Sequence, residues 1–246
     1  MASKDTYEKA YQNARGAAFI PNESLLKALD HRLIDEYVLN QNGATIDLLE
    51  AGCGDGCQFL FWKNKPLTTF IEAFDWSEAG IEIAKEKPEN CEIKFSVQEA
   101  ASFSYPQQFD LILDSHLLHC LTEASEREAY IHQVYDHLKM NGLFVGETMI
   151  EHKNFVLNDV VEVAYAEKLI YYKGEAQRYL ATSFEIESFL IDHGFKIEFF
   201  YIPYGLRMVP IPYREKALSS DPEVVRFIAR KVDPTELPQK QFNEYE

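Results

Sequence analysis

Short apolar runs alternate with longer amphipathic segments through most of this chain. Five runs have the length and apolar density of buried strands. They span 45–51, 68–75, 91–97, 109–115 and 142–150. Two later runs, 196–203 and 206–212, bring the predicted strands to seven, and Pro210 and Pro212 confine the last to an edge or end of the sheet.

Helical periods separate these strands. Ser77 is a suitable cap for a helix over 77–87, in which Ile81 and Ala84 share one face. A second amphipathic helix is predicted over 123–140, ended by Asn141-Gly142. Further helices are predicted at 58–65, 183–195 and 221–231.

Strands that alternate with helices indicate right-handed crossovers and an α/β fold with a mostly parallel sheet. No repeat or low-complexity linker interrupts the chain, so a single domain is expected. We divide it into a helical cap, a ligand-binding core, an irregular and largely helical insertion after the fifth strand, a segment that completes the sheet, and a tail. These parts span 1–42, 43–150, 151–183, 184–213 and 214–246.

Charge narrows the choice of partners. The 246 residues include 40 acidic and 24 basic side chains, for a net charge of −16. A nucleic acid backbone would be repelled at long range, so no nucleic acid partner is expected, and a cationic or neutral small molecule is favoured. No apolar run is long enough to cross a membrane, and the polar N-terminus does not resemble a secretory signal. A cytoplasmic protein without a membrane partner is expected.

The four cysteines support this expectation. Cys53, Cys57, Cys91 and Cys120 show neither paired spacing nor a histidine-rich metal pattern. Reduced thiols that fill small spaces are the simplest interpretation, and no metal site is predicted.

The strongest chemical signal is LLEAGCGDG at 48–56. Gly52, Gly54 and Gly56 follow a predicted strand and precede a predicted helix. Glycine allows the backbone to turn with positive φ and allows a ligand to approach where a Cβ would collide. Amides at such a turn bind the polar end of a ligand. The pattern therefore predicts a binding site for a nucleotide-like cofactor.

Asp75 lies twenty-three residues beyond Gly52, at the end of the next predicted strand. In an α/β sheet this position brings its carboxylate beside the glycine turn, where it accepts hydrogen bonds from ribose hydroxyls. The structural alternative is a capping role for the helix that starts near Ser77. The neighbouring glycine turn favours the ribose role.

These two signals suit a nicotinamide-dependent reductase as well as other enzymes. The third glycine of the GxGxxG dinucleotide fingerprint is missing, because position 57 is Cys. Glu50 adds a carboxylate at the tip of the first strand, which would attract a positively charged ligand group and repel a pyrophosphate. Both features count against the reductase.

From Ile46 to Ile150 the chain resembles the class I S-adenosylmethionine-dependent methyltransferases. LLEAGCGDG matches the first motif of that family, AFDWS the second, VQEA the third, and FDLILDSHLLHCL the fourth with the following helix start. The resemblance implies a Rossmann-like, seven-stranded, mostly parallel sheet flanked by helices. It also implies S-adenosylmethionine as cofactor and S-adenosylhomocysteine as product.

The resemblance also implies roles for individual residues. Glu50, Gly52, Gly54 and Gly56 occupy the cofactor positions of the first motif. Asp75 would hold the ribose and Trp76 would lie against the adenine. Glu99 would lie near the adenine amino group beside the Ala100 backbone, although Gln98-Glu99 replaces the more common Gly-Asp. Near the methyl donor it implies the residues Asp114, Ser115, His116 and His119.

The N-terminal segment YEKAYQNARGAAFIPNESLL is similar to the cap of thiopurine-methyltransferase-like enzymes, whose substrates are small. Tyr7, Tyr11 and Arg15 are spaced by four and share one stripe of a predicted helix. Either this stripe closes over the cofactor, with the tyrosines near the sulfonium and Arg15 on the methionine carboxylate, or it docks the helix on the core.

Methyl transfer would proceed by in-line displacement, which chiefly requires alignment of donor, methyl and acceptor. His119 and His116 are the candidate general bases if the acceptor must lose a proton; the alternative is a pair of structural histidines. Besides the reductase, a protein that binds the cofactor without turnover is the remaining alternative. Residues 1–40 and 151–215 are expected to determine the acceptor.

Overall fold

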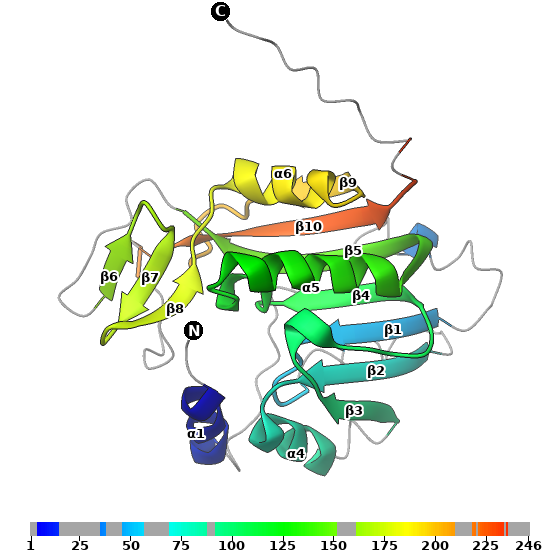
Figure 1. The fold of residues 1–246 in the computed structure, drawn as a ribbon, viewed down its shortest axis with the longest axis horizontal. Helices are drawn as coiled ribbons and strands as arrows, with labels where there is room; N and C mark the ends of the chain where they lie inside the picture. The colour runs from blue at the N-terminus through cyan, green and yellow to red at the C-terminus, as the bar shows by residue number, and fades with distance from the viewer. Residues whose placement is uncertain are drawn as a thin grey trace, which may run out of the picture.

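The computed structural model describes residues 4–14, 35–37, 46–56, 69–87, 92–151, 161–209, 218–219, 221–233 and 235. A seven-stranded sheet forms the centre, in the order β3-β2-β1-β4-β5-β10-β9 (Figure 1). The pairs among β1 to β5 are parallel, whereas β10 runs antiparallel to both of its neighbours. The strands are β1 Ile46–Ala51, β2 Thr69–Asp75, β3 Ile93–Val97, β4 Phe109–Ser115, β5 Leu138–Ile150, β9 Phe195–Tyr201 and β10 Glu223–Lys231. The predicted α/β fold is confirmed.

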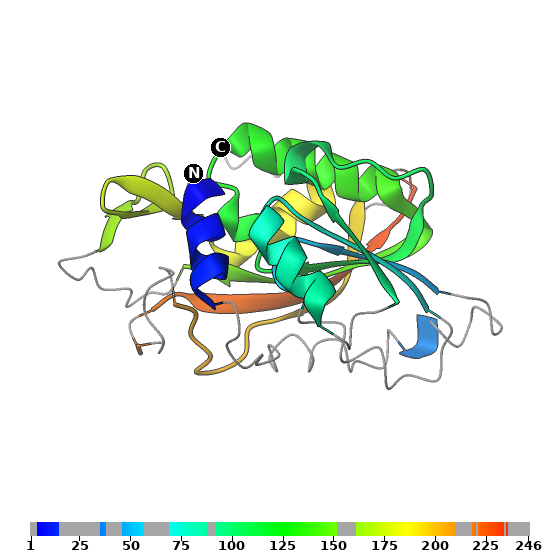
Figure 2. The same ribbon diagram turned by 90° about the horizontal axis from the view of Figure 1, so that it is seen from below.

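Helices cover both faces of this sheet (Figures 1 and 2). On one face, α5 (Ala124–His137) and α6 (Ser183–Asp192) pack against alternate strand residues such as Leu49. On the other, Ile81 of α4 (Glu78–Glu86) packs against the next residue, Leu48. Both faces of β1 are therefore buried, which explains its continuous apolar sequence.

The predicted helix at 221–231 is wrong, because this segment is the strand β10. It lies between β5 and β9, and its neighbouring residues Val224 and Val225 are both buried. A strand covered on both faces loses the alternating pattern that distinguishes it from a buried helix. The predicted strand at 206–212 is also wrong over residues 206–209, which join no sheet; residues 210–212 lie outside the described part.

The predicted helical insertion is also wrong over residues 161–179, which form a separate antiparallel sheet of β6 (Val161–Ala164), β7 (Leu169–Tyr172) and β8 (Glu175–Tyr179). Lys173 and Gly174 join β7 to β8, with φ of 52° and 78°. Positive φ at both central residues defines the tight hairpin turn that matches strand twist. The Lys-Gly pair was thus the signal for a hairpin.

One helix prediction needs a smaller adjustment, and another lies outside the described residues. The helix predicted at 123–140 ends at His137, and Asn141-Gly142 lies within β5 instead of ending the helix. The predicted helix at 58–65 lies outside the described residues, as does most of the predicted cap, of which α1 (Lys4–Ala14) is described. None of the described helices is long and apolar enough to span a membrane.

The register of the strands determines where a site can form. Ala51 at the end of β1 pairs with Phe74 of β2 and with Asp114 of β4. The residues that follow these three, Gly52, Asp75 and Ser115, therefore lie side by side at the carboxyl edge of the sheet. The chain leaves β1 toward β2 on one side, while β4 lies on the other. This reversal of strand order is the usual place for ligand binding in an open α/β sheet.

Candidate active site

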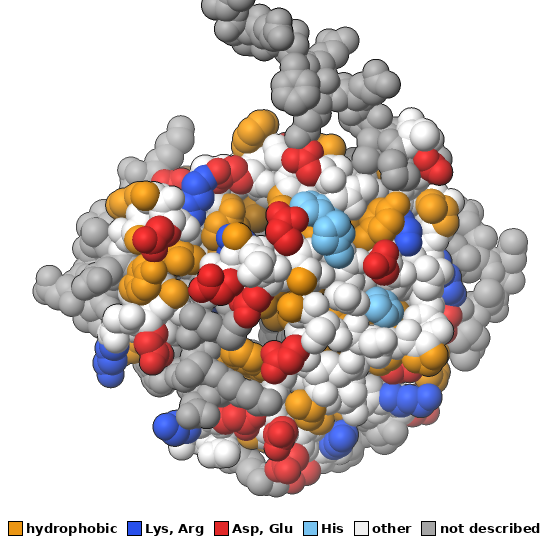
Figure 3. Space-filling model, viewed as in Figure 1, with side chains coloured by type: hydrophobic (Ala, Val, Ile, Leu, Met, Phe, Trp, Pro, Cys, Tyr) orange, Lys and Arg blue, Asp and Glu red, His pale blue; other side chains and the backbone are white. Residues whose placement is uncertain are grey.

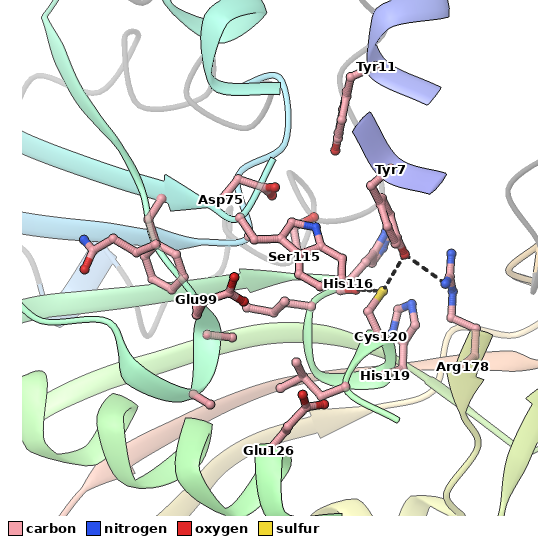
Figure 4. Close-up of a pocket in the computed structure, with 18 of the residues that line it drawn as sticks. Tyr7, Tyr11, Asp75, Glu99, Ser115, His116, His119, Cys120, Glu126 and Arg178 are labelled. Atoms are coloured by element: carbon pink, nitrogen blue, oxygen red, sulfur yellow. Dashed lines mark hydrogen bonds between the residues drawn. The ribbon is translucent and has the colours of Figure 1, made fainter. Parts of the chain in front are cut away.

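A cavity of about 300 Å³ opens at this carboxyl edge (Figure 4). Its walls include Gly52, Asp75 and Ser115 from the strand ends, and Tyr7 and Tyr11 from α1. Most of the residues predicted from the motifs contribute to these walls. Those that line it are Tyr7, Tyr11, Gly52, Asp75, Trp76, Glu99, Ala100, Ser115, His116 and His119.

The glycine turn and Asp75 form one hydrogen-bonded unit. All three glycines have positive φ: 68° at Gly52, 54° at Gly54 and 78° at Gly56. The Gly54 amide donates to Oδ2 of Asp75 at 2.9 Å, and the Ser77 amide donates to Oδ1 at 2.9 Å. A carboxylate oxygen can accept more than one hydrogen bond, so Asp75 can hold the turn and bind a ligand at the same time.

The structure assigns the N-cap of α4 to Ser77 instead of Asp75. The side chain of Ser77 itself caps α4 by accepting the Gly80 amide at 3.0 Å. Asp75 stands two residues before Ser77 and holds the glycine turn. It also borders the cavity, with 8% of its surface exposed. Burial raises the pKa of this carboxyl, and the amides of Ser77 and Gly54 oppose the rise.

Glu50 lies behind the cavity instead of in its wall. It is 1% exposed, and its Oε2 atom accepts no hydrogen bond from any described residue. Burial raises its pKa well above the usual value, and the nearby Asp55 and Asp75 raise it further. A buried carboxyl oxygen without a partner matches a ligand that brings a positive charge or a donor.

The opposite wall from α1 is acidic. Gln98, Glu99 and Ala100 follow β3 and line the cavity beside Trp76. Glu126, from the first turn of α5, lines it as well, and within the described residues its buried Oε2 has no hydrogen-bond partner. Sequence motifs did not identify Glu126, because its proximity to Glu99 arises only when α5 packs on the sheet. Two carboxylates at this end match the exocyclic amino group of a purine.

Asp114 has its hydrogen bonds inside the protein and does not line the cavity. Its oxygens accept from the amides of Leu117 and Leu118 and from the hydroxyl of Tyr130. Burial raises its pKa to about 6, with the Leu117 amide as the main opposing contact. These bonds hold the short 3-10 turn Leu118–Cys120, which carries His119.

His119 is 2% exposed and has a defined tautomer. Its Nδ1 atom accepts the Met149 amide at 3.2 Å and lies 3.2 Å from the hydroxyl of Thr148. The proton of the neutral ring is therefore on Nε2. Burial, followed by the charge of Arg178, lowers the pKa of His119 well below its usual range. In this environment His119 is a hydrogen-bond donor through Nε2 and the weaker of the two candidate bases.

His116 has a different environment. Its φ is 78°, and its Nε2 lies 2.7 Å from Oε1 of Glu147, whose other oxygen accepts from Arg226 at 2.7 Å. The side chain of His116 is 33% exposed, whereas that of Glu147 is 1% exposed. A buried carboxylate that holds one ring nitrogen fixes the orientation of a histidine ring. Of the two candidate bases, this geometry favours His116.

The helix α1 brings the predicted tyrosines to the cavity but with different neighbours. A Cβ on Gly54 would collide with the Tyr11 hydroxyl, so Tyr11 packs directly on the glycine turn. Tyr7 packs edge-on against Trp76, with ring centroids 5.6 Å apart. Its hydroxyl accepts from Arg178 at 2.9 Å and donates to the Cys120 sulfur at 3.4 Å. Arg15, the third member of the stripe, lies outside the described residues.

Arg178 belongs to the predicted acceptor-side insertion at 151–183, but the sequence assigned it no individual role. It is 8% exposed, lies on β8 and lines the cavity, although 171 residues separate it from Tyr7. No local pattern marks an arginine that reaches a site from a separate sheet. Its proximity to the motifs appears only in the folded chain.

One cluster of possible metal ligands lies away from the cavity. Ligand atoms of Glu128, His132 and His193 lie within 4.8 Å of one another, and none of the three lines the cavity. Figure 3 shows histidine side chains beside acidic ones on this face. His193 contacts Glu128 at 2.6 Å through Nε2 and the Phe189 carbonyl at 2.7 Å through Nδ1. These two hydrogen bonds account for the positions of Glu128 and His193.

Comparisons with known proteins agree with the motifs. Residues 48–142 match a family model described as a methyltransferase domain. Over 115 residues the chain is 27% identical to the malonyl-[acyl-carrier protein] O-methyltransferase of Priestia megaterium. The match covers 47% of this chain and 42% of the relative, so less than half of each protein is compared.

Solved structures share the fold over nearly the whole chain. The CcbJ methyltransferase from Streptomyces caelestis has a TM-score of 0.64 at 13% identity, with 94% of this chain and 100% of that chain covered. A 1,6-didemethyltoxoflavin-N1-methyltransferase from Burkholderia thailandensis, solved with S-adenosylhomocysteine, has a TM-score of 0.59 at 15% identity, with 94% and 87% covered. At these identities the likeness demonstrates a common fold.

Proposed function

We propose that the protein transfers a methyl group from S-adenosylmethionine to a small-molecule acceptor. The match of residues 48–142 to a methyltransferase domain and the class I fold support this proposal. The observation that carries this proposal is the unit of Gly54 and Asp75 at the edge of the cavity. It combines a backbone turn open to a ligand with a carboxylate suited to ribose hydroxyls.

The walls of the cavity suit the other parts of the cofactor. Trp76 offers an aromatic face, and Glu99 and Glu126 offer carboxylates to the adenine amino group. At the opposite end of the nucleoside, Glu50 lies behind the glycine turn and outside the cavity wall, with an Oε2 atom that has no hydrogen-bond partner among the described residues. We propose that it favours the amino group of the methionine part from behind the turn. The residues present therefore fit S-adenosylmethionine.

The bound cofactor would supply an electrophilic methyl on a good leaving group. The chain then has to exclude water and align the acceptor, for which Tyr7, His119 and Leu121 provide walls. His119 donates from Nε2 toward an acceptor atom. Where the nucleophile must lose a proton, His116 receives it, since Glu147 holds its ring in a fixed orientation.

The nicotinamide-dependent reductase is the weaker alternative. Tyr135 and Lys139 do have the Tyr-x-x-x-Lys spacing found in such reductases. However, Tyr135 donates to the Val232 carbonyl at 3.1 Å, and Lys139 pairs with Asp110 at 2.8 Å. Neither residue lines the cavity, so they have no access to a bound substrate there.

Turnover tests the proposal against a protein that only binds the cofactor. The purified chain would be incubated with S-adenosylmethionine and pools of small metabolites, and S-adenosylhomocysteine would be measured by mass spectrometry. We expect S-adenosylhomocysteine to form together with a product that is heavier than one of the metabolites by one methylene unit. Neither compound should form with the Asp75→Ala variant. Binding of S-adenosylhomocysteine without turnover in any pool would support the non-catalytic alternative.

A further inference from the structure

Arg178 is a buried cation whose described partners are all neutral. Its Nη1 atom donates to the Tyr7 hydroxyl at 2.9 Å and to the Gln177 carbonyl at 2.7 Å. No described carboxylate forms an ion pair with it, although it is 8% exposed. A guanidinium keeps its charge at every physiological pH, and burying it without an anion is costly.

The hydrogen bonds of Arg178 leave a particular part of the group for a ligand. Nη1 has two N–H groups, and Tyr7 and Gln177 accept from them. Within the described residues, Nε and Nη2 have no acceptor. These two atoms form the side of the guanidinium that binds both oxygens of a carboxylate in parallel.

Charges along the cavity separate by sign. Figure 4 shows Asp75 and Glu99 on one side and Arg178 on the other, with Tyr7 between them. The acidic side matches the nucleoside of the cofactor. Arg178 also lies outside residues 48–142, which match the methyltransferase domain. It therefore belongs to the part of the chain expected to determine the acceptor.

Besides the polar side chains of Tyr7, His119 and Cys120, apolar side chains line the Arg178 end of the cavity. Met208, Val209 and Leu121 line the same cavity. Met208 and Val209 pack on the cluster of Met149, Ile170 and Leu180, which anchors the small sheet. A ligand at this end meets one cation, with apolar side chains nearby.

We propose that Arg178 binds a carboxylate of the methyl acceptor, so that the substrate is an organic acid with an apolar body. This inference rests on the proposed methyltransferase function and identifies the substrate class for the same cavity. The small sheet of β6, β7 and β8 then serves to deliver Arg178 to the acceptor end. The net charge of −16 repels acids at long range, and Arg178 offsets that repulsion locally.

A pair of probes that differ only in charge tests the inference. Hexanoate and hexanamide would each be titrated by calorimetry into protein saturated with S-adenosylhomocysteine. We expect hexanoate to bind about tenfold or more tightly than hexanamide, as a charge-assisted bidentate contact predicts. Arg178→Gln should reduce this preference to within about twofold, and Arg178→Lys should retain part of it.

Two controls separate this inference from the cofactor assignment. Arg230→Gln removes an equal charge from an arginine paired with Glu198 outside the cavity, and should keep the hexanoate preference. Affinity for S-adenosylhomocysteine should stay within about threefold in Arg178→Gln, which also demonstrates a folded protein. Equal affinity of the wild-type protein for hexanoate and hexanamide would overturn the inference. A large loss of S-adenosylhomocysteine affinity would assign Arg178 to the cofactor carboxylate, and failure of the wild type to bind it would refute the proposed function first.

Discussion

The amide of Gly54 donates a 2.9 Å hydrogen bond to Oδ2 of Asp75, which joins the glycine turn after β1 to the acidic end of β2. The Ser77 amide adds a second bond to the same carboxylate. Asp75 thus organises the backbone of the site as well as bordering the cavity. A change at this residue is expected to alter ligand binding from two directions.

Asp75→Ala should weaken S-adenosylhomocysteine binding by tens of fold, roughly 2 kcal/mol or more, because hydrogen bonds to a charged group are lost. Calorimetric titration measures this directly. Asp233→Ala serves as the matched control, since Asp233 caps Thr235 at the surface and should leave affinity unchanged. A dissociation constant within about twofold of wild type in Asp75→Ala would remove the ribose role.

Gly54→Ala should destabilise the protein by more than a positive φ alone explains. A Cβ at this position collides with the Tyr11 hydroxyl, so α1 has to shift. Gly174→Ala is the control, because Gly174 has φ 78° but a Cβ there has no described atom within 4 Å. Urea denaturation should give a cost of roughly 1–2 kcal/mol for Gly174→Ala and a larger cost for Gly54→Ala. An equal loss in the free energy of unfolding for the two variants would mean that Tyr11 moves away from the new Cβ at no cost.

Asp114 should make stability depend on pH in a defined direction. Burial raises its pKa from 3.8 to about 6, so the folded state favours the protonated carboxyl. Its stabilising contribution is complete below about pH 4 and is lost as the pH rises through about 6. The free energy of unfolding of wild type minus that of Asp114→Asn should therefore fall by about 2 kcal/mol between about pH 4 and pH 7. A difference independent of pH would contradict this.

His119 should remain neutral, with its proton on Nε2. The Met149 amide occupies Nδ1, and burial together with Arg178 lowers its pKa well below the usual range. Histidine nitrogen shifts measured by NMR, with the signal assigned by its absence in His119→Gln, report both properties. A proton found on Nδ1, or titration near the usual histidine pKa of about 6.5, would restore His119 as a candidate base.

The sequence predicted the parts of the site that depend on local backbone geometry. Gly52 and Asp75 follow strands whose apolar runs are unmistakable, and parallel register then aligns them. Glu126 was missed, and Arg178 was assigned only to the acceptor-side insertion without a role, because their proximity to the cavity depends on contacts between distant segments. The strand β10 was missed for a related reason, since burial on both faces gives it the continuous apolar sequence of a buried helix.

The acceptor side shows the same limit. Tyr171, Tyr172 and Tyr179 were expected on helices, yet they lie on β7 and β8. Their segment carries no cofactor motif, and only the hairpin at Lys173-Gly174 signals its strands. The role in acceptor recognition that we propose for this sheet depends on its fold and could not be derived from motif spacing.

Calorimetric titration with S-adenosylhomocysteine, with NAD⁺ and NADP⁺ as parallel ligands, tests the central claim most directly. We predict micromolar binding of the thioether and no detectable binding of either dinucleotide, since the turn lacks the third dinucleotide glycine. Binding of a nicotinamide dinucleotide alone would contradict the methyltransferase function and leave the buried carboxyl of Glu50 without a role.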